Sequence, residues 1–141
     1  MNSSQMICAV GAATISIPLM VNAGTLLVDH AGASGSYATI SAAIAEAAPG
    51  DTIEIKPGIY TETLHVARDL TLECSDPSMR VVVNAGGVDR ALNNNSSSSY
   101  ANIDFTNGYS GWSGGGCLTS GSPVFTSCRF YDNSSAWSGA G

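Results

Sequence analysis

Two tryptophans near the end of the sequence carry the most distinctive chemistry of the chain. Trp112 and Trp137 each begin a Trp-Ser-Gly phrase, and the segments around them can be aligned as a repeat. If this repeat is one turn of a stacked fold, the two indoles occupy the same corner of successive turns, about 4.8 Å apart. Stacked indoles, with Tyr109 close by, present flat faces on which sugar rings can stack. The alternative is that these aromatics pack on their own loops and shield the edge of the fold.

The acidic side chains do not form a recognisable catalytic set. The eleven Asp and Glu residues are spread singly along the chain, whereas glycoside hydrolysis needs two carboxylates held across a cleft. Glu54, Glu62 and Glu73 are the best candidates for a cluster, on the exterior of adjacent strands, but a solvated face explains them more simply. Arg68 and Arg129 are likewise interpreted as edge residues that promote solubility. The sequence thus predicts no catalytic residue.

Cysteine and histidine spacing predicts neither a metal site nor a cofactor. Cys74, Cys117 and Cys128 form no Cys-x-x-Cys pair, and the two histidines, His30 and His65, are far apart in the sequence. The sequence has a fourth cysteine, Cys8, but cleavage after Ala23 would remove it and leave these three, an odd number, so at most one disulfide can form among them. We interpret the three thiols chiefly as small apolar core residues.

Composition and charge exclude some partners. Only 11% of the 141 residues are charged, the net charge is −6, and the five basic residues are scattered. Nucleic-acid binding requires a basic patch, so nucleic acid is not an expected partner. The 16 glycines and the low charge favour short stacked strands over a helical bundle.

The beginning of the chain, 1–23, predicts export. Residues 6–21 form an apolar run that is too short for a confident membrane span. Val21-Asn22-Ala23 places small residues where a signal peptidase would cut. We therefore expect a signal peptide at 1–23, a mature domain at 24–141 with no membrane span, and a secreted or cell-surface protein, at the outer membrane if bacterial. The alternative is a buried strand pair at the start of the fold.

Beyond the leader, apolar and polar residues alternate in about seven short runs, the period of strands with one buried face. The exception is 37–48, where apolar residues recur at helical spacing before Pro49-Gly50 ends the segment. Either Ser36 or Thr39 can serve as the N-cap. The polar stretch 93–99 has no apolar anchor and is expected to be a mobile loop.

Two architectures fit these strands, and the repeat decides between them. An antiparallel sandwich expects tight hairpin turns, but the one Asn-Gly pair, at 107–108, is not followed by a matched strand. A parallel coil explains why residues 101–116 overlay residues 126–141. The predicted fold is an all-β, right-handed parallel β-helix, a single-stranded solenoid with a short N-terminal capping helix. The residues expected inside it are Ile53, Ile55, Leu64, Val66, Leu70, Leu72, Ile103, Phe105, Cys128 and Phe130.

Residues 35–74 resemble the opening of a known family. The stretch GSYATISAAIAEAAPGDTIEIKPGIYTETLHVARDLTLEC has the Gly-x-Tyr-x-Thr-Ile start, the helix ending in Ala-x-x-Gly-Asp, and the Pro-Gly-x-Tyr-x-Glu turn between strands. This pattern resembles right-handed parallel β-helix proteins of the pectin lyase-like superfamily. The resemblance implies an N-terminal cap helix and first coils. It does not specify a reaction, because lyases, esterases, hydrolases and non-enzymatic surface proteins share the fold.

Residues 130–141 resemble a second, looser pattern. FYDNSSAWSGAG is similar to the repeats of polymorphic outer-membrane proteins and related bacterial surface β-helices, although Asn107 in the earlier copy stands one place early. We expect an exported or cell-surface, non-catalytic scaffold that faces carbohydrate, or an adhesin-like passenger with the same chemistry. The alternative is the N-terminal part of a polysaccharide lyase, esterase or glycoside hydrolase whose active site lies beyond residue 141.

The sequence stops on the second Trp-Ser-Gly phrase, at the same phase of the repeat where the first copy continues into another strand. We therefore expect 24–141 to be the N-terminal portion of a longer β-helix. An uncovered last coil would present unpaired backbone groups, so edge-to-edge self-association is expected.

Overall fold

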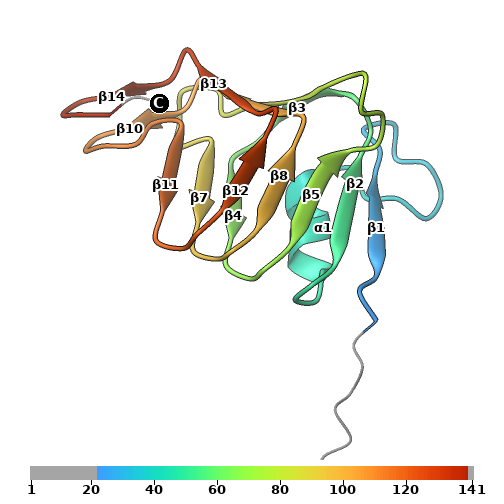
Figure 1. The fold of residues 1–141 in the computed structure, drawn as a ribbon. Helices are drawn as coiled ribbons and strands as arrows, with labels where there is room; N and C mark the ends of the chain where they lie inside the picture. Colours follow the sequence, from blue (N-terminus) through green and yellow to red (C-terminus); the bar gives the residue numbers. More distant parts are fainter. Residues whose placement is uncertain (1–21, 140–141) are drawn as a thin grey trace, which may run out of the picture.

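Fourteen short strands of the described chain, paired only in parallel, wind into a solenoid of about four turns (Figure 1). The computed structural model describes residues 22–139, so the predicted signal peptide lies almost entirely outside the described residues. Parallel pairing across 51–74 confirms the coil and excludes the antiparallel sandwich. The number of strands exceeds the seven expected, because the runs 51–60 and 101–105 each divide between two strands and because short or polar segments such as 92–94, 109–110 and 134–135 also pair.

Three long sheets run along the solenoid. The first three coils each contribute one strand to each sheet, whereas the strand at 25–28 pairs only in sheet A and the fourth coil has no strand in sheet C within residues 22–139. Sheet A contains β1 (Thr25–Val28), β2 (Thr52–Ile55), β5 (Thr71–Cys74), β8 (Ser99–Ala101) and β12 (Val124–Thr126). Sheet B contains β3 (Gly58–Thr61), β6 (Val81–Asn84), β9 (Ile103–Thr106) and β13 (Arg129–Tyr131). Sheet C contains β4 (Leu64–Val66), β7 (Leu92–Asn94) and β11 (Cys117–Thr119). A small fourth sheet, D, pairs β10 (Tyr109–Ser110) with β14 (Ser134–Ser135).

The repeat that aligns Trp112 with Trp137 is one full turn of the solenoid. In sheets A, B and D, the last two strands pair at this same offset, with Phe105 opposite Phe130 and Ser110 opposite Ser135. The corners between strands repeat at this offset as well. The backbone is left-handed at Asn107 (φ 53°) and again one turn later at Asp132 (φ 53°). The short polar side chains of Asn and Asp tolerate this conformation better than most residues.

The core lies inside the coils and matches the predicted set in all but its last two members. The first eight predicted inward residues, from Ile53 to Phe105, are buried. Cys128 and Phe130 point inward but are only half-buried. They belong to the fourth coil, and no further coil lies over them within residues 22–139.

The capping helix α1 (Ile40–Glu46) is shorter than the predicted 37–48. Tyr37 does not join it, because its backbone bonds to Leu27 and Asp29 of the neighbouring segment at 2.8 and 2.9 Å. Thr39 is the N-cap, and its hydroxyl oxygen accepts from the Ala42 amide at 3.2 Å. The helix packs against β1, β2 and β4 and buries Ile40 there. None of the helices in the described chain is long and apolar enough to cross a membrane.

The expectation of an unanchored loop at 93–99 is wrong. The segment supplies the end of β7 and the start of β8, and Asn94, Ser96 and Ser98 are buried inside the coil. Their polar atoms bond to one another: Asn94 donates to the Ser96 carbonyl at 2.7 Å, and Ser96 donates to the Asn94 side-chain oxygen at 2.9 Å. Buried polar groups are tolerated when they are hydrogen-bonded. The segment is therefore a polar layer of the core.

A projecting arm as candidate carbohydrate-binding surface

The corner between sheets B and C lengthens along the solenoid and becomes an arm. It spans 62–63 in the first coil, 85–91 in the second and 107–116 in the third. The third corner contains β10, and the fourth coil places β14 on it from residue 134 onward. We call residues 107–116 and 132–139 the arm; it projects from one side of the solenoid (Figure 1).

Glycines at the root of the arm allow its backbone segments to approach closely, both within the layer 107–116 and between this layer and the next. A side-chain carbon at Gly108 would lie 2.0 Å from the Gly115 carbonyl oxygen, and one at Gly115 would lie 2.1 Å from the Ser134 carbonyl oxygen. Only glycine fits such contacts with backbone. Asn133 then joins the layers, since its side-chain oxygen accepts from the Gly108 amide at 2.8 Å. The Gly-rich phrase of the sequence thus builds the arm.

The structure brings Trp112 and Trp137 together near the tip of the arm. Their ring centroids lie 6.0 Å apart, the ring planes are 14° from parallel, and the Trp137 amide donates to the Trp112 carbonyl at 3.1 Å. The side chains remain open to solvent, with 72% of Trp112 and 77% of Trp137 exposed. The indoles therefore pack on each other and not on the coil edge.

Tyr109 lies on the same arm but apart from the tryptophan pair. It is in β10, opposite Ser134 of β14, and is 42% exposed. Within residues 22–139 it forms no aromatic pair with either tryptophan. Its backbone amide donates to the Asp89 carbonyl at 2.9 Å, which ties the arm to the shorter corner of the second coil. Tyr109 therefore does not stack with the two indoles in the described chain.

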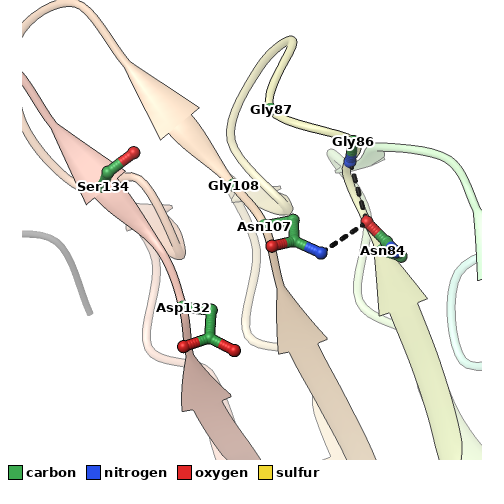
Figure 2. A pocket seen from close by; sticks show the side chains of 7 residues that line it. All are labelled: Asn84, Gly86, Gly87, Asn107, Gly108, Asp132 and Ser134. Carbon is green, nitrogen blue, oxygen red and sulfur yellow. Dashed lines mark hydrogen bonds between the residues drawn. The ribbon is translucent and has the colours of Figure 1, made fainter.

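A polar pocket of about 370 Å³ lies at the root of the arm (Figure 2). It is lined by Asn84, Gly86, Gly87, Asn107, Gly108, Asp132 and Ser134. Asn84 ends β6, Asn107 follows β9 and Asp132 follows β13, so one side chain comes from each of three successive coils. Its volume is within the range of small-molecule sites. We did not predict this pocket from the sequence, although the repeat places Asn107 on Asp132.

The side chains of this pocket form an interrupted amide ladder. The Asn107 amide nitrogen donates to the Asn84 oxygen at 3.1 Å, and that oxygen also accepts from the Gly86 amide at 2.9 Å. The next position in the row is Asp132, whose carboxylate makes no hydrogen bond with residues 22–139. An ionised carboxylate can only accept. The ladder therefore ends on acceptors that have no donor in the described chain.

The predicted grouping of Glu54, Glu62 and Glu73 is only partly formed. Glu54 and Glu73 are register partners on sheet A. Glu62 instead caps α1, where its carboxylate accepts from the amides of Ile40 at 2.9 Å and Ser41 at 2.8 Å. A carboxylate at a helix N-terminus satisfies free amides and opposes the helix dipole. Glu62 therefore holds the cap in place.

Arg129 is not a simple edge residue, because it pairs with a buried carboxylate. Asp104 is fully buried on β9, and its two oxygens pair with Arg80 from the second coil and Arg129 from the fourth. Burial by itself raises the pKa of Asp104, but the hydrogen bonds from Arg129 and Arg80 outweigh it and hold that pKa below its usual value. The cluster ties three coils together. Arg68 likewise donates to the Ala47 carbonyl at the end of α1.

The remaining candidate groups are consistent with structural roles. Cys74, Cys117 and Cys128 are all free thiols, and burial raises the pKa of Cys117 to about 11, which disfavours the reactive thiolate. Within residues 22–139, no three His, Cys, Asp or Glu side chains are grouped so that they could hold a metal ion. The arrangement that suits ligand binding is the arm, with its exposed indoles and polar pocket.

Comparisons with known proteins do not assign this chain to a family. No family model, no curated protein and no solved structure matches the chain. The resemblance of residues 35–74 to the pectin lyase-like superfamily thus rests on its sequence pattern and on the parallel β-solenoid alone.

Proposed function

We propose that this protein is an exported or cell-surface, non-catalytic β-solenoid of the pectin lyase-like superfamily whose arm binds polysaccharide. Trp112 and Trp137 form the stacking platform, and Tyr109 flanks it. The observation that carries the proposal is the exposure of two large, mutually stacked indoles on a projecting element, at 72% and 77%. Exposed apolar groups of this size, held in a fixed arrangement, mark binding surfaces.

The geometry of the indole pair supports binding of a flat, partly apolar ligand. The two rings are nearly parallel and overlap only in part, so within residues 22–139 most of the surface of each indole remains open to a ligand. The second coil has no layer of the arm, because its corner (85–91) is shorter and contains no strand of sheet D. Sugar rings present C–H faces that pack on indoles, and their hydroxyl groups remain available for hydrogen bonds. A polysaccharide can therefore contact the indoles and the polar arm at once.

The pairing of the indoles also lowers the entropic cost of binding. Trp112 and Trp137 are carried by backbones that bond to each other, with the Ser138 amide also donating to the Trp112 carbonyl at 3.3 Å. Each ring restricts the rotamers of the other, so less side-chain freedom is lost when a ligand binds. A preorganised aromatic surface is the arrangement expected for carbohydrate recognition.

The test is a titration of the full chain with soluble glycans, followed by tryptophan fluorescence and calorimetry. We expect at least one glycan to quench the fluorescence and bind, and Trp112→Ala to weaken that binding by about tenfold or more, since truncated interface tryptophans are often energetically dominant. Ile59→Ala is the matched control, because Ile59 is 62% exposed on sheet B, outside the arm. Absence of binding across neutral, basic and acidic glycans would overturn the proposal.

Two related hypotheses stay predictions. The enzyme alternative places its active site beyond residue 141. Self-association would use the outer edges of β12 and β13, and sedimentation of the protein over a range of concentrations tests it. The glycan titration of the Trp112→Ala variant tests neither the enzyme alternative nor self-association.

A further inference from the structure

We infer that the polar pocket at the root of the arm binds a second unit of the same saccharide, and that this unit is an uncharged, hydroxyl-rich sugar. The inference rests on the proposed function of the arm. It adds a second subsite and a ligand class, which the indole pair by itself does not specify.

The pocket and the indoles lie on the same element and within reach of one chain of sugars. Gly108 and Ser134 line the pocket, and Trp112 and Trp137 follow them closely in the sequence. At about 3.3 Å per extended residue, this separation is at most roughly 13 Å. In the sequence, Tyr109 follows Gly108 directly and precedes Trp112. An oligosaccharide of a few units can therefore contact both subsites.

The free hydrogen-bonding groups of the pocket are acceptors, so they favour a ligand that has hydrogen-bond donors. Figure 2 shows the Asn107 oxygen turned away from Asn84, on the side of Asp132, while the Asn107 nitrogen is engaged by Asn84. Neither the Asn107 oxygen nor the Asp132 carboxylate accepts a hydrogen bond from residues 22–139. Asn107 and Asp132 are both exposed, so water hydrates these acceptors in the free protein, and a ligand that displaces this water has to bring hydrogen-bond donors of its own. The hydroxyls of a sugar supply them.

Charge selects against acidic sugars. Asp132 is the one ionisable residue in the lining of the pocket, and the protein carries a net charge of −6. A uronate carboxylate placed there would meet a like charge. A calcium ion is also a poor fit, because Ca²⁺ takes six to eight oxygen ligands, usually with several carboxylates. A neutral sugar fits both the acceptors and the single charge.

Asp132→Asn is the discriminating variant, because it changes the pocket without straining the corner. Asparagine tolerates the left-handed backbone at position 132 (φ 53°). The new amide can donate to the Asn107 oxygen, which continues the ladder, and it replaces the charged carboxylate by a single neutral acceptor oxygen. We expect the Kd of a neutral glycan to rise about tenfold, as for loss of a hydrogen bond to a charged group. The melting temperature should stay the same or rise.

The measurement uses the full chain with neutral probes (laminarin, xyloglucan, galactomannan and dextran) and polygalacturonate as the acidic probe. Asp76→Asn is the control, since it removes a surface carboxylate at the corner between sheets A and B. The inference predicts neutral binding, weak or no binding of polygalacturonate, and an effect of Asp132→Asn but not of Asp76→Asn.

The outcomes separate this inference from the proposed function. If glycans bind and Trp112→Ala abolishes binding while Asp132→Asn has no effect, the pocket subsite is wrong and the indole platform stands. Polygalacturonate binding as tightly as the neutral glycans also overturns it. So does binding that depends on added Ca²⁺ and is lost with a chelator, which would indicate a cation at Asp132. If no glycan binds at all, both proposals fail.

Discussion

The two ends of the solenoid carry similar inward residues but bury them to different extents. At the N-terminal end, α1 packs on the first strands, and its inward residues Ile40 and Ala43 are fully buried. At the other end, Phe130 stacks on Phe105 with ring centroids 5.0 Å apart, yet only Phe105 is fully buried. Phe125 stands in the same relation to Tyr100, at 5.0 Å.

This difference shows that burial in a solenoid is set by the neighbouring coils. Phe105 and Phe130 have the same residue type, the same place in the repeat and register-paired strands. Phe105 has a coil on each side, whereas within the described chain Phe130 has a coil on one side only. In a stack of this kind, stability is approximately a sum of terms between neighbours. The same substitution should therefore lower the free energy of unfolding by different amounts at Phe105 and at Phe130.

The largest expected effect compares Phe105→Ala with Phe130→Ala. Removing a fully buried aromatic ring should lower the free energy of unfolding by about 3–5 kcal/mol. At the half-buried Phe130 the loss should be on the order of 1–2 kcal/mol, because less apolar area is removed from water. Urea unfolding of the full chain, followed by circular dichroism, measures both. Equal losses would show that the fourth coil is covered in solution, for example by another copy.

A second prediction concerns Asp104, which joins the third coil to coils on both sides. Asp104→Asn should cost about 2 kcal/mol at neutral pH, since hydrogen bonds from Arg80 and Arg129 to a charged partner are lost. The folded pKa of Asp104 is lowered. Its stabilising contribution is therefore present above the unfolded value, about 3.9, and disappears as the pH falls through the folded pKa.

Unfolding of the wild type and Asp104→Asn from pH 7 to pH 2 tests this linkage. The two curves should converge in acid, because the protonated carboxyl of the wild type resembles the amide. A constant gap between the curves down to pH 2 would contradict the ion-pair explanation.

The smallest expected effect lies at the covered end. Glu62→Gln should lower the free energy of unfolding by about 1 kcal/mol, since it weakens the charged cap on the Ile40 and Ser41 amides. Glu54→Gln is the matched control on sheet A. Because Glu54 lies opposite Glu73, its neutralisation should be neutral or slightly stabilising. If Glu62→Gln caused no more loss than Glu54→Gln, the carboxylate of Glu62 would not hold the cap.

Some features of the fold could be predicted because they depend on short-range patterns. Alternation of apolar residues placed Ile53, Leu72 and Phe105 inside, and the repeat aligned Phe105 with Phe130. Strand geometry has a period of two, so a buried face is visible in the sequence. The indole pair followed from the same repeat.

Other features depend on contacts between coils of unequal length. Along sheet A, Thr52 pairs with Thr71, Thr71 with Ser99, and Ser99 with Val124, so no single period relates successive coils. Arg129 meets Asp104 at the 25-residue offset of the repeat, whereas Arg80 comes from a coil that pairs at a different offset and reaches the same carboxylate. Polar inward residues such as Asn94 were missed because their burial depends on hydrogen bonds, which leave no apolar pattern.

The sequence by itself determined the parallel coil, its inward apolar residues and the stacking of Trp112 on Trp137, because each follows from local alternation and one repeat. Only the tertiary structure decided the arm, the pocket at Asn107 and Asp132, and the cap formed by Glu62. These features join corners of different lengths and residues that are far apart in the sequence. They form because specific hydrogen-bonding groups from different coils come into contact. The order of residue types along the sequence does not show which of these groups will become partners.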